Sequence, residues 1–274
     1  MTSDRRAQLA ANLDEVRGRI ARACTAAGRP PSAVTLVAVT KTYPASDVEL
    51  LASLGVTDVG ENKDQEAAAK AAAVPAPLRW HFVGQLQRNK AKSVVRYADV
   101  VESVDSLRLV AALARAAAEH RTAPLDVLIQ ISLDGDPSRG GAVGSLSVPS
   151  SSLSVPLSPS AVTPSRSAPN HASSDISGLP DVVDPERDLW RVAEAVAAAD
   201  GLRLGGVMAV APIGWDPDRA FEILARLAER LRAQHPGATA VSAGMSGDLE
   251  AAVRHGATHV RIGTSLLGMR NTLR

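Results

Sequence analysis

The chain has little cysteine, few aromatic residues and almost no surplus of charge. Cys24 is the only cysteine among the 274 residues, which excludes a disulfide within the chain and a cysteine-rich zinc site. Aromatic residues make up 3% of the chain, so aliphatic side chains and alanine must fill the core. The 30 basic and 29 acidic residues leave a net charge of +1. Because nucleic-acid binding needs a basic surplus on one face, the composition gives no support to that class of partner.

Long apolar segments are also missing. No window approaches the roughly 20 apolar residues of a membrane-spanning helix. Residues 1–24 are charged throughout, unlike a secretory signal. We therefore expect a cytoplasmic protein with no membrane contact. The same N-terminal segment predicts an amphipathic helix that ends near residue 28, with Cys24 in the core and four apolar residues on one face: Leu9, Leu13, Val16 and Ile20.

Short apolar segments alternate with helical patterns along the chain. The segments predicted as strands are 35–41, 56–60, 79–84, 99–104, 125–133, 202–210, 239–244 and 258–263. Helical patterns follow at 46–54, 61–73, 87–96, 106–119, 186–199, 218–234 and 247–256, with a short one after residue 264. Such alternation favours parallel strands joined by right-handed crossovers. Eight units of this kind predict an α/β fold, a closed (β/α)8 barrel of TIM type.

The alternative fold is an open doubly wound sheet, which usually carries a glycine-rich turn after its first strand. No G-x-G-x-x-G follows residues 35–41, so the sequence favours the barrel. We expect a single domain over residues 1–274.

Residues 138–185 interrupt the alternation. Serine and proline dominate this segment, and between residues 143 and 180 its only charged residues are Arg166 and Asp175. Such a composition cannot bury enough apolar surface to offset the entropy of ordering. We predict a disordered insertion that leaves the C-terminal rim of the barrel. We prefer an insertion without a function of its own; a flexible lid and a phosphorylated tether are the alternatives.

Residues 36–44 read LVAVTKTYP and place a lysine at the end of a strand that looks buried on both faces. In a barrel, side chains at the C-terminal strand ends converge on one pocket. We expect Lys41 there, desolvated and with a lowered pKa, so that its neutral amine can form a Schiff base with a carbonyl compound. Position alone gives equal weight to an ion pair between Lys41 and a rim carboxylate such as Glu61.

Two turns on the other side of the predicted pocket suit an anion. In SAGMSGDLEAAV, Ser246 is expected at a helix N-cap and Asp248 in the first turn. In RIGTSLLG, Gly263 and Thr264 open a short helix. Helix N-termini beside the last two strands of a barrel commonly bind phosphate. For Ser246 alone, a plain cap is the simpler interpretation, but an amine and an anion site in one pocket together predict a phosphorylated carbonyl ligand.

Seven motifs occur in order along nearly the whole chain: VAVTK at 37–41, GEN at 60–62, HFVGQLQRNK at 81–90, VLIQIS at 127–132, GVMAV at 206–210, SAGMSGDLEAAV at 242–253 and VRIGTSLLG at 260–268. Together they resemble the YggS/PROSC family of pyridoxal-phosphate-binding (PLP homeostasis) proteins. The resemblance implies a single barrel similar to the N-terminal domain of alanine racemase. It also implies pyridoxal 5'-phosphate (PLP) as cofactor, and a non-catalytic carrier or reservoir that passes PLP to apo-enzymes.

The resemblance also assigns residues by their position in the motifs. Lys41 matches the lysine that forms an internal aldimine with PLP. Arg261, which is always charged and has only donors, would disfavour protonation of the pyridine nitrogen and so carbanion chemistry. His81 has no assigned chemistry, and we expect a hydrogen-bonded residue beneath the pocket. The cofactor-binding set that the resemblance implies is Lys41, Asn62, Met208, Ser246, Arg261, Gly263 and Thr264.

Two enzymatic alternatives stay open: a PLP-dependent racemase with a reduced site, and a Schiff-base aldolase that uses a lysine without a cofactor. Racemases that resemble this barrel have a second, β-rich domain that supplies the opposing base. Tyr43 is expected to pack at the rim rather than act as that base. We therefore expect no racemase activity and no catalytic residue. We also expect no metal site and a monomer.

The insertion is the main departure from the family pattern. The family commonly runs from a Lys/Arg-Gly pair, here Arg139-Gly140, directly into a helix, whereas the Ser/Pro-rich segment follows that pair in this chain.

Overall fold

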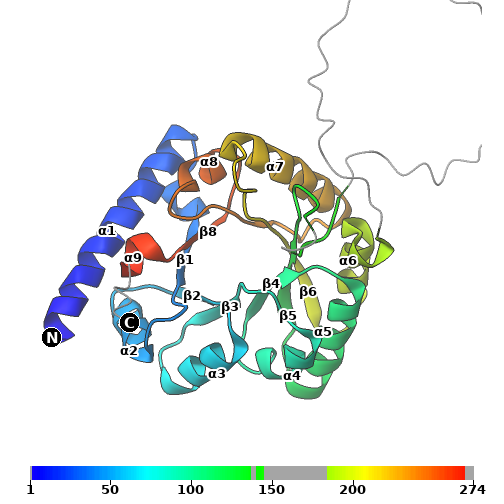
Figure 1. Ribbon diagram of the computed structural model, residues 1–274, viewed down its shortest axis with the longest axis horizontal. Helices are drawn as coiled ribbons and strands as arrows, with labels where there is room; N and C mark the ends of the chain where they lie inside the picture. The colour runs from blue at the N-terminus through cyan, green and yellow to red at the C-terminus, as the bar shows by residue number, and fades with distance from the viewer. Residues whose placement is uncertain (1, 137–139, 145–183, 269–274) are drawn as a thin grey trace, which may run out of the picture.

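The computed structural model describes residues 2–136, 140–144 and 184–268. In this part of the chain eight strands form a closed barrel in sequence order, and the last strand pairs with the first (Figure 1). All neighbours are parallel. The predicted (β/α)8 barrel is confirmed, and the open-sheet alternative is wrong. The strands are β1 (Thr35–Val39), β2 (Asp58–Glu61), β3 (Arg79–Phe82), β4 (Val100–Val104), β5 (Leu125–Gln130), β6 (Leu202–Met208), β7 (Ala240–Ser242) and β8 (His259–Ile262).

Helices form a ring outside the strands (Figure 1). The predicted helix at 87–96 is divided into a short 3-10 turn, η2 (Arg88–Lys90), and a single α-helical turn, α4 (Ala91–Val94). Two further 3-10 turns are η1 (Pro31–Ala33) and η4 (Pro185–Arg187). The other helices are α1 (Thr2–Ala26), α2 (Ala45–Ser53), α3 (Asp64–Ala73), α5 (Leu107–His120), α6 (Leu189–Ala197), α7 (Pro217–Gln234), α8 (Leu249–Arg254) and α9 (Thr264–Leu267).

The apolar core lies between the strands and the helices, and it is built from aliphatic residues and alanine as the composition predicts. The interior of the barrel is different. A small apolar cluster of Val100, Leu128 and Met208 occupies part of it. The rest contains buried charged groups, among them His81, Glu102 and Arg261. Because a buried charge is tolerated only when it is paired, this interior requires a specific hydrogen-bond pattern.

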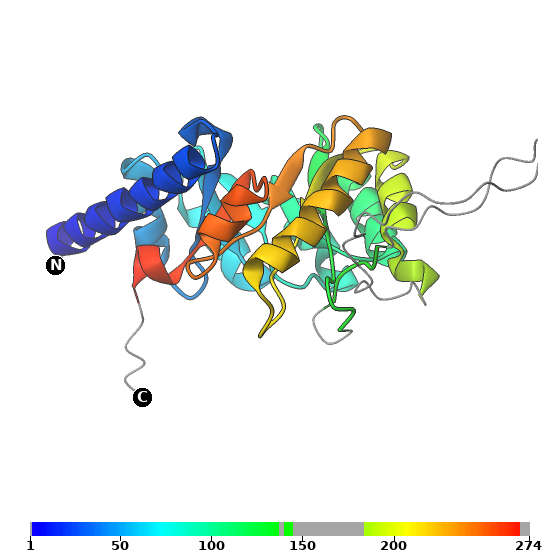
Figure 2. The ribbon, with the colours of Figure 1, turned by 90° about the horizontal axis from the view of Figure 1, so that it is seen from above.

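Helix α1 lies along the flank of the barrel (Figures 1 and 2). Its apolar face, including the buried Cys24, packs in one cluster with residues of α8 and α9. Two polar side chains of α1 bind carbonyl groups of α9: Arg5 Nη2 donates to Leu267 O at 3.0 Å and Asn12 Nδ2 donates to Leu266 O at 2.9 Å. The amphipathic helix is confirmed.

Most of the predicted insertion, residues 145–183, lies outside the described residues. The prediction nevertheless began too early, because residues 140–144 belong to the barrel rim. Ser132 N donates to Ala142 O at 2.8 Å, and Val143 N donates to Arg187 O at 2.8 Å. Gly141 adopts φ 108°, and a Cβ added there would lie 2.6 Å from Ser132 N. Only glycine fits at this close approach.

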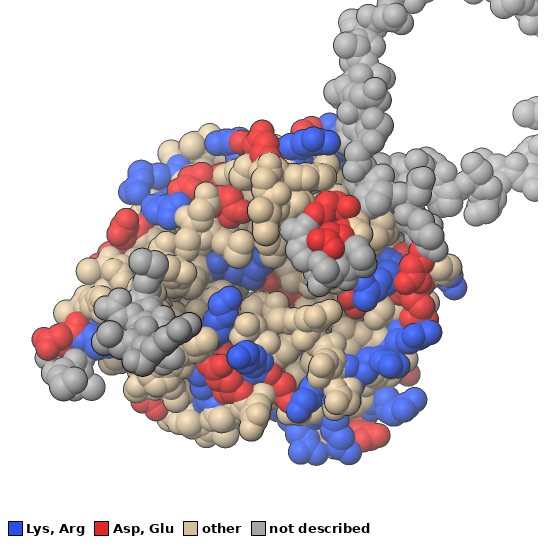
Figure 3. All heavy atoms as spheres, in the orientation of Figure 1, with Lys and Arg blue, Asp and Glu red and all other residues tan. Residues whose placement is uncertain are grey.

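None of the helices in the described ranges combines the length and the apolar character of a membrane span. Lysine and arginine side chains are interspersed with carboxylates on the face shown in Figure 3. That distribution agrees with the balanced charge of the sequence.

Candidate functional site

Lys41 lies at the C-terminal mouth of the barrel, directly after β1. Thr40 N donates to Gly60 O at 2.9 Å, which extends the pairing of β1 with β2 by one residue before the chain turns. Lys41 is exposed, so the prediction of a desolvated lysine is wrong for this structure. The alternative ion pair with Glu61 is also wrong. Glu61 Oε1 binds Lys70 Nζ at 2.6 Å, and within the described residues Lys41 makes no ion pair.

The turn after β7 differs from its prediction. Helix α8 begins at Leu249 and its N-cap residue is Asp248, whereas Ser246 lies earlier in the turn. Asp248 Oδ1 accepts a hydrogen bond from Met245 N at 2.6 Å and closes the turn. Arg19 Nη1 of α1 donates to Ser246 O at 3.1 Å. Ser246 is therefore not a helix cap, and its carbonyl group is held from the α1 side.

The turn after β8 agrees with its prediction. Gly263 is the N-cap residue of α9, and Thr264 is the first helical residue. A Cβ added to Gly263 would lie 3.3 Å from Val39 O, so this turn abuts the end of β1 next to Lys41. Among the described residues the backbone N–H groups of Ser246 and Thr264 donate no hydrogen bond. Both turns thus offer free donors at the mouth.

Arg261 extends from β8 into the barrel interior. Its Nη1 donates to Ser242 Oγ at 2.7 Å and its Nη2 donates to Ala209 O at 2.8 Å. Nη1 also lies 3.7 Å from Glu102 Oε2. Burial lowers the pKa of Arg261, while the charge of Glu102 opposes this effect. Because Ala209 follows Met208 at the end of β6, the guanidinium reaches the strand that carries Met208.

A chain of hydrogen bonds runs beneath Arg261. His81 Nδ1 lies 2.6 Å from Glu102 Oε1, and His81 Nε2 lies 3.0 Å from Asp58 Oδ1. Ser242 Oγ donates to Glu102 Oε2 at 2.6 Å and so connects the chain to Arg261. We call these five residues the axial chain: Asp58, His81, Glu102, Ser242 and Arg261. His81 is buried and hydrogen-bonded, as expected, and its role beneath a ligand pocket stays a prediction.

The axial chain is charged at neutral pH. Burial alone would lower the pKa of His81, but the hydrogen bonds to Asp58 and Glu102 outweigh it and raise the pKa to about 9. Burial alone would raise the pKa of Glu102, but the hydrogen bond to His81 and the charges of His81 and Arg261 lower it to about 2. Two carboxylates thus alternate with two cations along the chain.

Asn62 lies after β2, on the Lys41 side of the mouth. Its Oδ1 is buried and has no hydrogen-bond partner within the described residues. Gly84 packs directly on its backbone, since an added Cβ would lie 2.2 Å from Asn62 O. A buried polar atom without a partner is costly unless a ligand or water satisfies it. The exposed amine of Lys41, the turns with free N–H donors and Asn62 thus all follow C-terminal strand ends, and an amine with anion-binding N–H groups is the chemistry that suits a phosphorylated carbonyl compound.

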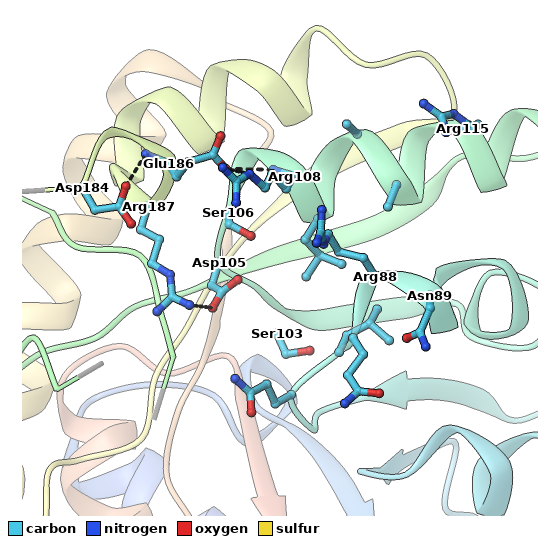
Figure 4. A pocket seen from close by; sticks show the side chains of 16 residues that line it. Arg88, Asn89, Ser103, Asp105, Ser106, Arg108, Arg115, Asp184, Glu186 and Arg187 are labelled. Atoms are coloured by element: carbon cyan, nitrogen blue, oxygen red, sulfur yellow. Dashed lines mark hydrogen bonds and ion pairs between the residues drawn. The ribbon is translucent and has the colours of Figure 1, made fainter. Parts of the chain in front are cut away.

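A groove of about 1230 Å³ lies beside the C-terminal ends of β3 and β4, between η2 and α5 (Figure 4). Arg88 extends from η2 toward α5, which contributes Arg108. Acidic residues in the groove balance part of its charge: Arg108 pairs with Glu186 at 3.6 Å, and Arg187 pairs with Asp105 at 3.8 Å. None of the predicted cofactor-binding residues lines this groove. It is therefore not part of the candidate site.

Sequence reasoning missed several polar residues that support the mouth. Glu102 and Ser242 lie in apolar strands, where their inward direction depends on the register. Lys70 is buried although α3 reads as a polar surface helix. The one available signal was the (i, i+4) pair of Glu66 and Lys70, and such pairs are usually solvated.

The sequence profile of the family described as "Alanine racemase, N-terminal domain" matches residues 11–145. Alanine racemase from Corynebacterium glutamicum has a similar fold, with a TM-score of 0.57 and 16% identity. That similarity covers 96% of this chain and 64% of the racemase chain. The fold is therefore of the same class as the N-terminal domain of alanine racemase.

More similar proteins identify the family within this class. A pyridoxal phosphate homeostasis protein from Mycobacterium tuberculosis is 41% identical over 283 residues, covering 97% of this chain and 95% of the relative. PipY from Synechococcus elongatus, solved with PLP bound, has a TM-score of 0.66 and 28% identity, covering 95% of this chain and 100% of PipY. This chain belongs to the family of pyridoxal phosphate homeostasis proteins, which confirms the resemblance seen in the motifs.

Proposed function

We propose that this protein binds PLP at the barrel mouth, holds it covalently through Lys41, and serves as a non-catalytic carrier or reservoir in PLP homeostasis. The observation that carries the proposal is the position of Lys41. Its exposed amine follows the strand end that Gly263 abuts, beside turns with free N–H donors. PLP supplies an aldehyde, with which a primary amine condenses with loss of water. The PLP-bound structure of PipY, a relative of the same fold, supports the choice of ligand.

In this proposal, the remaining residues of the mouth bind different parts of PLP. Backbone N–H groups of the turns that contain Ser246, Gly263 and Thr264 bind the phosphate. Asn62 and Met208 lie against the ring from opposite sides of the mouth. Such a division matches a ligand that is anionic at one end and reactive at the other.

Arg261 supports a carrier over an enzyme. A guanidinium offers donors only, so beside the ring nitrogen it opposes protonation there. Its own charge is favoured by Glu102 through the contact at 3.7 Å. Tyr43 is not placed as a second base either, because its hydroxyl donates to Gly268 O at 2.5 Å. Both observations speak against the racemase alternative. The aldolase alternative predicts instead that the protein shows no visible absorbance and that borohydride traps a sugar phosphate.

Reduction with borohydride tests the covalent link. PLP is added to the purified protein, the visible absorbance is recorded, and the reduced adduct is located by peptide mass spectrometry. We expect one adduct, on Lys41, and none in Lys41→Ala, whereas Lys92→Ala on the exposed face of α4 remains like the wild type. An adduct that persists in Lys41→Ala would refute the assignment. Exchange of the α-proton of alanine in deuterated water would instead support the racemase alternative.

The proposal extends to the state of the protein in the cell. We propose that residues 1–274 act as a single PLP-binding domain, as a monomer in the cytoplasm, with apo PLP-dependent enzymes as recipients. Light scattering tests the monomer. Transfer is tested by the rate at which an apo-aminotransferase regains activity from the loaded protein, compared with the same concentration of free PLP.

A further inference from the structure

A buried group of polar residues lies behind Lys41, between the ends of β1 and β2 and the helix α3. We call it the Lys70 cluster: Thr40, Glu61, Glu66 and Lys70. Lys70 Nζ donates to Glu61 Oε1 at 2.6 Å, to Glu66 Oε1 at 2.7 Å and to Thr40 O at 2.8 Å. All three donors of the ammonium group are therefore used. Lys70 is 6% exposed and Glu61 is 0% exposed, so these contacts lie largely out of water.

The carbonyl and the hydroxyl of Thr40 both form hydrogen bonds within this cluster. Its carbonyl accepts from Lys70, and its hydroxyl donates to Glu61 Oε1 at 2.6 Å. The residue before Lys41 is thus fixed by its backbone and by its side chain. A buried threonine with every polar group paired has little freedom to change its rotamer or its backbone angles.

The residue after Lys41 is fixed in an unfavourable conformation. Thr42 has φ 69°, and among the described residues no other non-glycine residue has a positive φ. For a β-branched residue this conformation costs about 1–3 kcal/mol and persists only when its surroundings hold it. Thr42 N donates to Glu66 Oε1 at 2.6 Å, the oxygen that also accepts from Lys70. The cluster therefore binds the chain on both sides of Lys41.

Lys41 itself has no ion pair within the described residues, and its side chain is exposed. Contacts of the side chain therefore do not set the direction of the amine. The backbone from Thr40 to Thr42 must do so, because it fixes where the Cα–Cβ bond of Lys41 points.

We propose that Lys70 and Glu66 are positioning residues, which hold the backbone around Lys41 so that its amine is directed into the barrel mouth. This inference rests on the proposed function, in which Lys41 is the amine that binds PLP. Holding a reactive group in place raises its rate of reaction, and a small misplacement lowers that rate by about ten- to hundredfold.

The test is the rate of PLP binding by Lys70→Met. The variant removes the three donors but keeps the length and the apolar stem of the side chain. Burial raises the pKa of Glu61, so this carboxyl can take up a proton when its partner is removed, and we expect the variant to fold. Lys92→Met is the matched control, because Lys92 is exposed on α4 and pairs with Glu119 at 3.3 Å.

Two ligands separate positioning from general damage. Stopped-flow absorbance with PLP reports formation of the covalent link, and calorimetry with pyridoxine 5'-phosphate, which has no aldehyde, reports the phosphate and ring contacts alone. We expect Lys70→Met to form the link about tenfold more slowly and to bind pyridoxine 5'-phosphate like the wild type. An unchanged rate, or an equal loss for both ligands, would overturn the inference. Failure of the proposed function is distinguishable, because the wild type would then show no adduct on Lys41.

Glu66 allows a sharper test of the contact with Thr42. Glu66→Gln keeps a carbonyl oxygen for Thr42 N, whereas Glu66→Ala removes it. We expect slow link formation in Glu66→Ala and a rate within about twofold of the wild type in Glu66→Gln. Equal slowing in both variants would overturn the role of Glu66 as the group that holds Thr42.

Discussion

Two buried networks support the barrel mouth, and they differ in what they hold. The axial chain lies in the barrel interior and ends on the side chain of Arg261. The Lys70 cluster lies between the strand ends and α3 and ends on the backbone beside Lys41. A fixed side chain suits Arg261, whose guanidinium would face one atom of a ligand. A fixed backbone suits Lys41, because in the proposed function its amine reacts at the end of a long and mobile side chain.

The networks also differ in their balance of charge. In the axial chain, Asp58 and Glu102 oppose His81 and Arg261, and all four are buried. In the Lys70 cluster, one cation faces two carboxylates, and the side chain of Glu66 is 27% exposed. Solvent can therefore partly compensate a change at Glu66, whereas every charged member of the axial chain is buried. We expect the axial chain to matter more for stability.

The largest effect is expected from Glu102→Ala. The substitution leaves the charges of His81 and Arg261 buried without the carboxylate between them, and breaking a buried pair costs about 3–5 kcal/mol. Urea unfolding at neutral pH measures this loss in the free energy of unfolding. A loss below about 1 kcal/mol would mean that the axial chain is as tolerant as the Lys70 cluster, and the comparison would fail.

Next in size is the effect of pH on the axial chain. The folded-state pKa of His81, about 9, lies above its ordinary value of 6.5. Its contribution is therefore fully present below pH 6.5 and is lost as the pH rises through about 9. We expect the free energy of unfolding to fall by on the order of 2–3 kcal/mol over this range. His81→Gln should be less stable than the wild type at pH 6.5, and its free energy of unfolding should not fall in this way with pH. An equal fall in the variant would mean that other groups cause the pH dependence.

A smaller loss is expected from Lys70→Met. Glu61 can become protonated and Glu66 is partly solvated, so we expect a loss of about 1–2 kcal/mol in the free energy of unfolding at neutral pH. The same urea experiment applies. A loss as large as that of Glu102→Ala would erase the distinction between the two networks.

The smallest effect is expected at the other end of the barrel. Asp126 of β5 binds Arg79 and Arg203, but the side chain of Arg203 is 65% exposed. Exposed pairs contribute about 0.5 kcal/mol. Arg203→Ala should lose no more than that and should form the covalent link with PLP at the wild-type rate. A slower link would show that the mouth depends on distant ion pairs.

The barrel was predictable because its signals are local. Apolar segments and helical patterns alternate in the sequence, and parallel topology then brings every strand end to one mouth. Lys41, Asn62 and Arg261 are placed there by the order of elements alone. Most predicted strands nevertheless ran too long at their C-terminal ends; β1, for example, ends at Val39, although Thr40 still donates to Gly60 O.

The supporting residues were not predictable for tertiary reasons. The sequence of α3, DQEAAAKAAA, reads as a solvated helix, and Lys70 is buried only because the ends of β1 and β2 pack on it. Ser246 and Asp248 are both good N-cap residues, and only the closure of the turn on Met245 decides between them. The left-handed Thr42 follows no local preference, because threonine disfavours that conformation.

Helix α1 has a consequence for how the protein is made. Arg5 and Leu267 are 262 positions apart, and Asn12 and Leu266 are 254 positions apart. At 5–20 residues per second, the ribosome adds the intervening segment in roughly 13 to 50 seconds. During that interval the apolar face of α1 has no partner from α8 or α9 and can pack only on earlier segments such as η1 and α2. A nascent chain therefore cannot complete the barrel mouth until translation has passed residue 267.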